Sequence, residues 1–425
     1  MSSINILYAQ SGGVTAVINA SAAAVIRRAR ELRPATGRIF AARRGILGLI
    51  REELVDTDAF DEDALERLAQ RPGGAFGSSR YDLPDAAAEP ALYDRIFAVL
   101  AAHRIGAFLY NGGNGSMDVV ARLSAEARRR GYPLVCVGVP KTVDNDIEGT
   151  DCCPGFGSSA KFLATSMLEA GLDIGSMAAR VGRVFVMEVM GRNVGWLAAA
   201  TALAAPATAD GSPDPDHPPH IILMPEAGFD EARFLARVEE IVRRVGYCTI
   251  TVAEGLTSAD GAALMEQVRD AKGYVQLGGA GGVVARLIHD RLGYKYHWAV
   301  PDYLQRAAGH WVSATDHAQA LAVGAAAVDY ALAGRDGCMA AIRRLADSPY
   351  RWEVVPVDAA TVANRERRVP AEFISADGLH VSAAGRRYLE GLIEGERAVP
   401  SVGGLPDYRL VELVPEARTL PPFAG

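Results

Sequence analysis

Residues 138–146 read Gly-Val-Pro-Lys-Thr-Val-Asp-Asn-Asp. They follow the apolar residues 134–137, and a short apolar run of this kind is typical of a buried strand. Pro140 ends that strand, so the polar residues fall at its carboxyl end. Ligands bind at the carboxyl ends of the strands in open α/β sheets. The segment therefore indicates an open α/β sheet with a ligand site at this turn.

Four polar side chains gather on the turn, those of Lys141, Thr142, Asp144 and Asp146. A carboxylate beside a lysine suits phosphoryl transfer. Asp144 could accept the proton of an attacking hydroxyl while Lys141 neutralises charge on the moving phosphoryl group. The alternative is an ordinary polar turn whose Asp and Asn side chains bond to their own backbone. On these residues alone the ordinary turn is the simpler interpretation.

The size and composition indicate a two-lobed globular enzyme. A chain of 425 residues is too long for one ordinary core, which predicts two α/β lobes. Hydrophobic residues make up 49% of the chain and charged residues 22%, as in soluble globular proteins. The formal net charge of −7 argues against a nucleic-acid partner, because nucleic-acid-binding proteins usually carry a basic surface.

The five cysteines have neither the spacing of zinc ligands nor that of a Cys-x-x-Cys pair. We therefore expect no disulfide framework, and a reducing cytoplasm as the location. The N-terminus shows no basic region followed by an apolar core, and no apolar stretch is long enough to span a bilayer. The sequence thus predicts neither export nor a membrane partner.

Two glycine-containing turns each lie between a predicted strand and a predicted helix. Residues 10–16 follow the apolar residues 4–9, and residues 111–116 follow the apolar residues 107–110. Unpaired backbone N–H groups and the helix dipole make such turns anion sites. A single glycine pair is weak support, since any tight turn between a strand and a helix can contain one.

The sequence Pro-Lys-Thr-Val-Asp-Asn-Asp of residues 140–146 resembles the signature of the phosphofructokinase family. Its lysine resembles the pyrophosphate-dependent members in particular, since ATP-dependent members usually have glycine there. The resemblance covers nearly the whole chain. It implies an α/β fold of two Rossmann-like lobes with mainly parallel sheets and an active site between the lobes.

The resemblance also implies a division of the chain. Residues 1–150 are expected to bind the donor phosphates and residues 151–330 the sugar phosphate. Residues 331–425 are expected to form a C-terminal extension, part of which packs back on the first lobe. The proline-rich residues 204–219 predict an exposed loop between the lobes.

The resemblance implies a set of donor-binding residues. These are Gly12, Gly13, Arg80, Asn114, Gly115 and Ser116. For Arg80 the alternative is an exposed side chain on a flexible loop. Lys141 indicates pyrophosphate, but Asn114 replaces an Asp that lies near Mg²⁺ in ATP users. Gly115 replaces an Asp that repels the α-phosphate of a nucleotide in pyrophosphate users. The donor, pyrophosphate or ATP, therefore stays open.

A second implied set binds the sugar phosphate. It consists of Thr142, Arg183, Met190, Gly191, Arg192, Glu226, Tyr303 and Arg306. Glu226 is expected to accept hydrogen bonds from sugar hydroxyls. Arg183 is expected to reach the sugar phosphate of a neighbouring subunit, so the resemblance implies a homo-oligomer, a dimer or a tetramer. Tyr303 replaces a usual histidine, and Gly309 stands where this branch usually has a second arginine. The acceptor's identity therefore stays open.

The implied reaction transfers a phosphoryl group from pyrophosphate to the C1 hydroxyl of fructose 6-phosphate, giving fructose 1,6-bisphosphate. Asp144 is expected to act as the base and Asp146 to hold Mg²⁺, while Lys141, Arg80 and Arg192 stabilise charge. One alternative is an ATP-dependent kinase, or a kinase of another sugar phosphate such as sedoheptulose 7-phosphate. The other is a catalytically weak subunit that binds sugar phosphate and regulates a partner.

Overall fold

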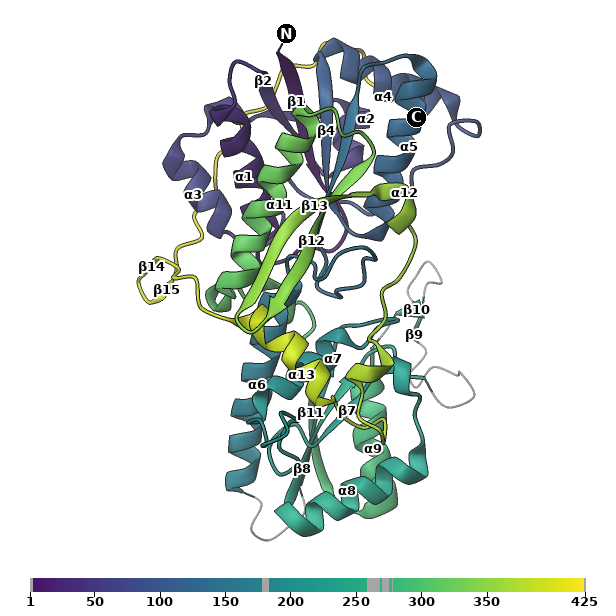
Figure 1. The fold of residues 1–425 in the computed structure, drawn as a ribbon, viewed down its shortest axis with the longest axis vertical. Coiled ribbons are helices and arrows are strands. Elements are labelled where there is room, and N and C mark those ends of the chain that lie inside the picture. Colours follow the sequence, from purple (N-terminus) through teal and green to yellow (C-terminus); the bar gives the residue numbers. More distant parts are fainter. Residues whose placement is uncertain (1–2, 178–182, 258–267, 270–274, 277, 424–425) are drawn as a thin grey trace.

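The computed structural model describes residues 3–177, 183–257, 268–269, 275–276 and 278–423, and it shows two lobes stacked along the long axis (Figure 1). Each lobe contains a largely parallel sheet covered by helices on both faces. The predicted α/β class with two lobes is confirmed.

The first lobe contains a seven-stranded sheet in the order β13-β12-β5-β4-β1-β2-β3. The strands are β1 Ile4–Gln10, β2 Thr36–Ala42, β3 Leu54–Asp56, β4 Ile105–Gly112, β5 Val135–Pro140, β12 Cys338–Asp347 and β13 Tyr350–Asp358. Only the edge strands β3 and β13 pair antiparallel. Because β1 lies between β2 and β4, the direction in which the chain adds strands to the sheet reverses at β1. A ligand site is expected at the carboxyl ends of β1 and β4.

Helices cover both faces of this sheet, which explains its continuous apolar strands. In β1, Ile6 and Tyr8 face one buried cluster, whereas Leu7 and Ala9 face the other. The first face carries α1 Ile18–Glu31, α3 Glu62–Gln70 and α11 Ala314–Leu332. The second carries α2 Ile46–Arg51, α4 Pro90–Ala102, α5 Asn114–Arg130 and α12 Ala359–Val362.

The second lobe contains a four-stranded, fully parallel sheet in the order β11-β6-β8-β7. The strands are β6 Arg183–Val189, β7 Ile221–Leu223, β8 Tyr247–Ala253 and β11 Lys295–Ala299. The helices of this lobe are α6 Phe156–Ser176, α7 Trp196–Ala200, α8 Glu231–Val245, α9 Ala280–Leu292, α10 Leu304–Ala307 and α13 Ala383–Glu390. Two short hairpins complete the described strands, β9 Val268–Arg269 with β10 Val275–Gln276, and β14 Ser401–Val402 with β15 Leu405–Pro406.

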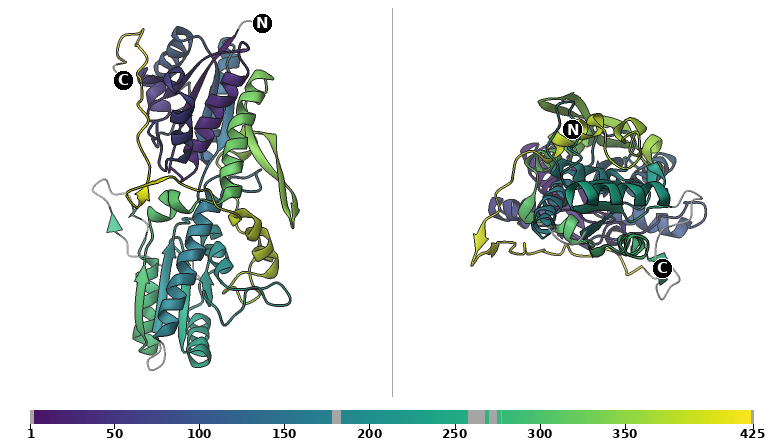
Figure 2. Two further views of the ribbon diagram at one scale, coloured as in Figure 1. Left: turned by 90° about the vertical axis from the view of Figure 1, so that its left-hand side faces the viewer. Right: turned by 90° about the horizontal axis from the view of Figure 1, so that it is seen from below.

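The division of the chain differs from the expected one in its C-terminal half. Helix α11 packs on α1 in the first lobe, although residues 151–330 were expected in the second. Gly324 permits this approach, because a side chain there would collide with the carbonyl oxygen of Ser21. The described residues 331–423 form no separate extension. Strands β12 and β13 join the first sheet, α13 packs in the second lobe, and the tail runs back along the first lobe (Figure 2).

The expectation of a loop between the lobes at residues 204–219 is wrong. This segment connects two elements of the second lobe and packs on it. Arg386 of α13 donates a hydrogen bond to the carbonyl oxygen of Ala205 at 2.7 Å. Pro218 lies against Gly171 of α6, where a side chain would collide with the proline ring. Proline-rich composition predicted irregular structure here but not its place in the fold.

The five cysteines are buried free thiols. None of the described helices has the length and apolar character needed to cross a membrane.

Candidate active site

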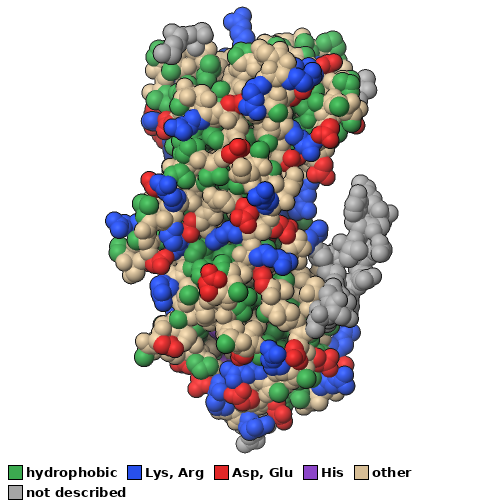
Figure 3. Space-filling view, turned by 45° about the vertical axis from the view of Figure 1, so that its right-hand side comes forward, with side chains coloured by type: hydrophobic (Ala, Val, Ile, Leu, Met, Phe, Trp, Pro, Cys, Tyr) green, Lys and Arg blue, Asp and Glu red, His purple; other side chains and the backbone are tan. Residues whose placement is uncertain are grey.

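A cavity of about 620 Å³ lies between the carboxyl edges of the two sheets. The expected site residues that line it are Gly12, Gly13, Arg80, Lys141, Thr142, Asp144, Asp146, Met190, Arg192, Tyr303 and Arg306. Six other expected residues do not line it, namely Asn114, Gly115, Ser116, Arg183, Gly191 and Glu226. The molecule narrows between its lobes, and basic and acidic side chains lie interspersed over the face shown in Figure 3.

Lys141 joins the turn after β5 to the turn after β1. Its Nζ donates hydrogen bonds to the carbonyl oxygens of Ser11 (2.7 Å) and Gly13 (2.5 Å). The side chain is 2% exposed, and burial lowers the pKa of Lys141 to about 8, although Asp146 and Asp144 oppose the shift. The ammonium group is therefore still mostly charged at pH 7, at the floor of the cavity.

The loop that ends at Arg80 is docked on the turn after β1 by a backbone hydrogen bond, whereas Arg80 itself is exposed, as the alternative predicted. The backbone N–H of Gly12 donates to the carbonyl oxygen of Ser79 at 3.0 Å, and Gly12 has a left-handed φ of 72°. A Cβ added at Gly13 would lie 3.0 Å from a guanidinium nitrogen of Arg306 and 4.0 Å from one of Arg80. Guanidinium groups from both lobes thus converge over Gly13, a charge arrangement that suits phosphate.

The carboxylate of Asp144 faces the cavity. Burial raises the pKa of Asp144 to about 7, the neighbouring Asp146 and Glu254 raise it further, and Lys141 and Arg80 oppose them. A carboxyl group with a pKa near neutrality suits a general base. The backbone N–H of Asp144 donates to Oγ1 of Thr142 at 3.0 Å, so this hydroxyl orders the turn.

Asp146 and Asn114 provide oxygen atoms that fit a magnesium ion. Asn114 Nδ2 donates to Oδ2 of Asp146 at 3.2 Å, while Asn114 Oδ1 is buried without a hydrogen-bond partner among the residues that the structure describes. No group of three or more His, Cys, Asp or Glu side chains in the described part of the chain could hold a metal alone. Mg²⁺ usually binds through one or two carboxylates together with substrate phosphates, so this donor set fits.

The turn after β6 forms the opposite wall of the cavity. Gly191 has a φ of 136°, and a side chain there would collide with the carbonyl oxygen of Val194. The backbone N–H of Gly191 donates to Oε1 of Glu254 at 3.3 Å. Glu254 lines the cavity, and burial raises its pKa. The position of Glu254 directly after a strand could have marked it as a site residue. Glu226 also follows a strand, however, so position alone did not distinguish the two.

That second residue, Glu226, lies away from the cavity. It follows β7, the edge strand of the sheet, and its Oε1 accepts hydrogen bonds from the backbone N–H groups of Gly195 and Val369, each at 3.0 Å. The expected contact with sugar hydroxyls inside this cavity is therefore not supported for Glu226. Its carboxylate ties the turn before α7 to the C-terminal segment.

Arg183 is the first residue of β6, at the strand end opposite the cavity. A strand rises about 3.3 Å per residue, which puts Arg183 about 23 Å from Met190. The cavity of its own chain is therefore out of reach. The expected contact with a neighbouring subunit stays a prediction.

Tyr303 and Arg306 line the cavity from the segment after β11. The guanidinium group of Arg306 lies 4.0 Å from the ring centroid of Tyr303, a cation–π contact that orients the cation. Three further polar side chains that line the cavity were not predicted, those of Asp302, Asn193 and Glu366. Asn193 Nδ2 donates to Oε1 of Glu366 at 2.6 Å, so the last two act as one polar wall.

A family model described as phosphofructokinase matches residues 5–331. The chain belongs to the phosphofructokinase family. It is 51% identical over 410 residues to a protein of Methylococcus capsulatus named pyrophosphate–fructose 6-phosphate 1-phosphotransferase, with 96% of each chain covered. It is 31% identical to a sulfofructose kinase of Alkalicoccus urumqiensis, covering 92% of this chain and 96% of that one. A solved structure of the pyrophosphate-dependent phosphofructokinase from Nitrosospira multiformis superposes with a TM-score of 0.90 at 45% identity, over 99% of both chains.

The phosphofructokinase match ends well before Glu366, although this residue lines the cavity. The C-terminal segment thus adds a wall to the site of a phosphofructokinase core. Motifs within the matched region could not have indicated this contribution.

Proposed function

We propose that the chain transfers a phosphoryl group from pyrophosphate to the C1 hydroxyl of fructose 6-phosphate, giving fructose 1,6-bisphosphate. The observation that carries the proposal is the buried ammonium of Lys141, bonded to two carbonyl oxygens of the donor turn. This ammonium places a fixed positive charge at the position where ATP-dependent members of the family usually have glycine. The relative in Methylococcus capsulatus, 51% identical, supports the same donor and acceptor.

In the proposed mechanism, the acceptor's C1 hydroxyl lies against Asp144 and attacks one phosphorus of pyrophosphate in line, which breaks the bridging P–O bond and releases inorganic phosphate. Asp144 takes the hydroxyl proton, and its pKa of about 7 makes it a usable base at neutral pH. Lys141, Arg80 and Arg192 stabilise the charge that spreads over the phosphoryl oxygens. Little covalent chemistry is required of the protein, so positioning and electrostatics dominate.

Asp146 would hold Mg²⁺, with the orphaned amide oxygen of Asn114 beside it. The bound ion supplies charge neutralisation on the diphosphate oxygens. Asn114 also orients Asp146 through its amide N–H group.

We assign the remaining binding roles by lobe. The first lobe binds the donor through the turns at Gly12, Gly13 and residues 113–116. The second binds the sugar phosphate through Met190, Gly191 and Arg192, together with Glu254, Tyr303 and Arg306. We further propose a homo-oligomer in which Arg183 serves the site of a neighbouring subunit, since its own cavity is out of reach.

A second candidate function has the same fold and reaction but a different acceptor substrate. A Cβ added at Gly309 would lie 2.6 Å from the hydroxyl of Tyr408, so the tail occupies the place of the branch-typical arginine. One cation that could bind an acceptor phosphate is therefore missing. Similarity to a sulfofructose kinase favours testing a sulfonated sugar phosphate as the acceptor.

The test is steady-state turnover with Mg²⁺, combining pyrophosphate or ATP with fructose 6-phosphate, sedoheptulose 7-phosphate or a sulfonated analogue. We expect the highest kcat/KM with pyrophosphate and fructose 6-phosphate. Asp144→Asn should lower kcat by about 10²- to 10⁴-fold. Asp336→Asn is the control, because Asp336 bonds to Ser124 and Arg128 at the opposite end of the sheet. Turnover with ATP alone, or full activity of Asp144→Asn, would contradict the proposal.

A further inference from the structure

The residue between the two carboxylates of the site, Asn145, has an unusual backbone conformation. Its φ is 56°, in the left-handed region that residues other than glycine rarely adopt. Asn tolerates this region better than most residues, because its short side chain can form local hydrogen bonds. Asn145 is fully buried. The directions of Asp144 and Asp146 therefore depend on what holds Asn145 in place.

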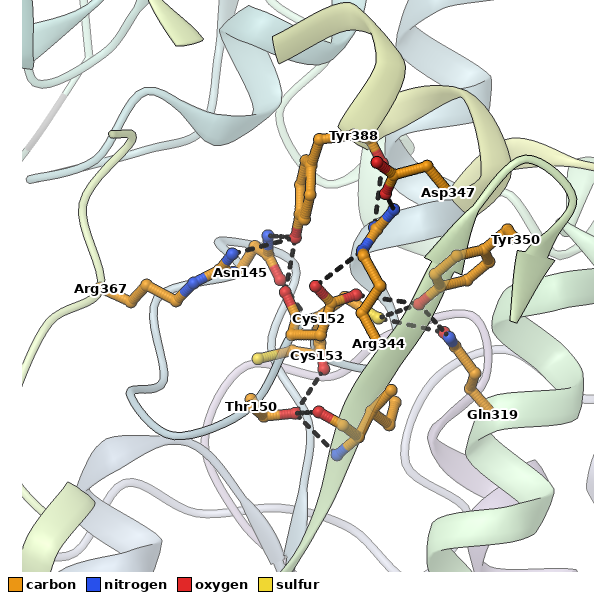
Figure 4. Close-up of polar contacts among 12 residues, drawn as sticks. Asn145, Thr150, Cys152, Cys153, Gln319, Arg344, Asp347, Tyr350, Arg367 and Tyr388 are labelled. Carbon is orange, nitrogen blue, oxygen red and sulfur yellow. Dashed lines mark hydrogen bonds and ion pairs between the residues drawn. The ribbon is translucent and has the colours of Figure 1, made fainter. Parts of the chain in front are cut away.

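Both polar atoms of the Asn145 side chain are engaged (Figure 4). Oδ1 accepts a hydrogen bond from the backbone N–H of Cys153 at 3.0 Å, within the first lobe's own loop. Nδ2 donates to the hydroxyl of Tyr388 at 3.2 Å. Tyr388 lies 243 positions later in the chain, on α13 in the second lobe. A side chain of the second lobe thus holds the turn of the first.

The Tyr388 hydroxyl uses its full hydrogen-bonding capacity. It donates to the carbonyl oxygen of Asp151 at 2.5 Å and accepts from Asn145 Nδ2 and from a guanidinium nitrogen of Arg367 at 3.1 Å. The backbone N–H of Arg367 in turn donates to the carbonyl oxygen of Asp146 at 2.8 Å. The contacts from Tyr388 and Arg367 thus hold two consecutive residues of the turn, Asn145 and Asp146.

Packing fixes the Tyr388 ring, which is 6% exposed. Its centroid lies 5.2 Å from that of Trp196 and 5.2 Å from that of Phe373. The guanidinium group of Arg344 lies 4.4 Å from the ring centroid, and its NH2 nitrogen donates to the carbonyl oxygen of Tyr388 at 3.0 Å. The hydroxyl therefore has one well-defined position, as a positioning group requires.

We propose that Tyr388 is a positioning residue for phosphoryl transfer, whose hydroxyl holds Asn145 in the conformation that directs Asp144 and Asp146 into the cavity. The inference rests on the proposed function, because it assigns those two carboxylates to the reaction. Tyr388 itself is not among the described residues that line the cavity. Its effect passes through Asn145 and Arg367. The alignment of the Asp144 and Asp146 carboxylates therefore depends on how α13 and the segment around Arg367 pack against the first lobe.

Tyr388→Phe tests this inference, since it removes one hydroxyl and keeps the packed ring. We expect kcat to fall about 10- to 100-fold, the scale expected for small misplacement of reacting groups, with each KM within about twofold. Tyr350→Phe is the matched control. Its hydroxyl donates to Oδ2 of Asp151 at 2.9 Å in the same network but bonds to no residue of the 141–146 turn. It should keep kcat within about twofold at a similar loss of Tm. An equal loss of kcat in both variants would overturn the inference.

A double-mutant cycle gives a readout that a merely structural role would not move. Asn145→Gly keeps the left-handed backbone accessible and removes both side-chain bonds. We expect Tyr388→Phe to lower kcat much less in the Asn145→Gly background than in the unmodified chain. If kcat of the double variant fell by the product of the two single-variant losses, the inference would be overturned. The cycle uses whichever donor and acceptor the unmodified chain turns over fastest, so failure of pyrophosphate or fructose 6-phosphate overturns only the proposed substrates. No turnover with any pair would overturn both.

Discussion

Oε1 of Glu254 accepts a hydrogen bond from the backbone N–H of Gly191 at 3.3 Å, and this contact joins the carboxyl ends of the neighbouring strands β8 and β6. The contact holds Glu254 against the turn after β6, whose residues Met190 and Arg192 line the cavity. We therefore expect the second oxygen of this carboxylate to accept hydrogen bonds from acceptor hydroxyls.

Glu254→Gln should raise the KM for the sugar phosphate about tenfold, because losing a hydrogen bond to a charged group costs about 1.5 kcal/mol or more. Steady-state kinetics at saturating donor measures the change. Glu226→Gln is the paired control, and it should lower Tm while leaving this KM within about twofold, since the partners of Glu226 in the described part of the chain are two backbone N–H groups. A larger KM effect in Glu226→Gln than in Glu254→Gln would contradict the assignment.

Lys141→Met should lower kcat with pyrophosphate about 10²- to 10³-fold, because it removes a fixed charge beside the developing transition state. The chain offers a good control in Lys161, another buried lysine outside the cavity. Lys161 donates to the carbonyl oxygen of Gly395 at 2.6 Å and lies over the Trp311 ring. Lys161→Met should lower Tm and keep kcat. If both variants lose activity in proportion to stability, Lys141 has only a structural role.

Much of the fold was predictable because the central strands β1, β4 and β5 of the first sheet are largely buried and read as nearly continuous apolar runs. The same periodicity could not assign α11 to a lobe. The alanine-rich sequence of α11 indicates a buried helix, but its close approach to α1 at Gly324 depends on the three-dimensional packing.

The site shows the same division between local and long-range information. The turns at Gly12 and Lys141 were recognisable because their chemistry is contiguous in sequence. Glu226 and Glu254 both follow a strand, and only the strand order shows that β7 is the edge strand while β8 lies next to β6. The contributions of Glu366 and Tyr388 come from far along the chain, where no local motif marks them.

Gly115→Asp should restrict the donor without harming the fold. Gly115 is exposed near the N-terminus of α5, and a Cβ added there would meet no atom within 4 Å. An acidic residue in the first helical turn is compatible with the helix dipole. We expect turnover with pyrophosphate to stay within about twofold and ATP to become a weaker competitor of pyrophosphate. Gly115→Asn adds nearly the same volume without charge, so it should weaken ATP less. Equal effects of the two variants would exclude charge repulsion.

His220 makes the stability of the second lobe sensitive to acid. Its ring is 2% exposed, and Nδ1 accepts a hydrogen bond from the backbone N–H of Thr249 at 3.0 Å. A proton on Nδ1 would oppose that N–H group, and burial lowers the pKa of His220 to about 4. Its ordinary pKa is about 6.5, so the unfolded chain binds more protons between these two values. The stabilisation is therefore fully present above pH 6.5 and is lost as the pH falls towards 4.

At pH 5 the loss attributable to His220 should be about 2 kcal/mol of unfolding free energy relative to pH 7. Urea unfolding at the two pH values, followed by circular dichroism, measures it. His220→Asn keeps an oxygen that can accept from Thr249 and does not titrate, so its stability should fall less between pH 7 and pH 5. His217→Asn is the control, because the His217 side chain is 52% exposed, and it should keep the full loss. If His220→Asn retained the same pH dependence as the unmodified chain, the acid sensitivity would have to come from other groups. The half-buried His317 and His380, whose pKa values desolvation also lowers, would be tested next.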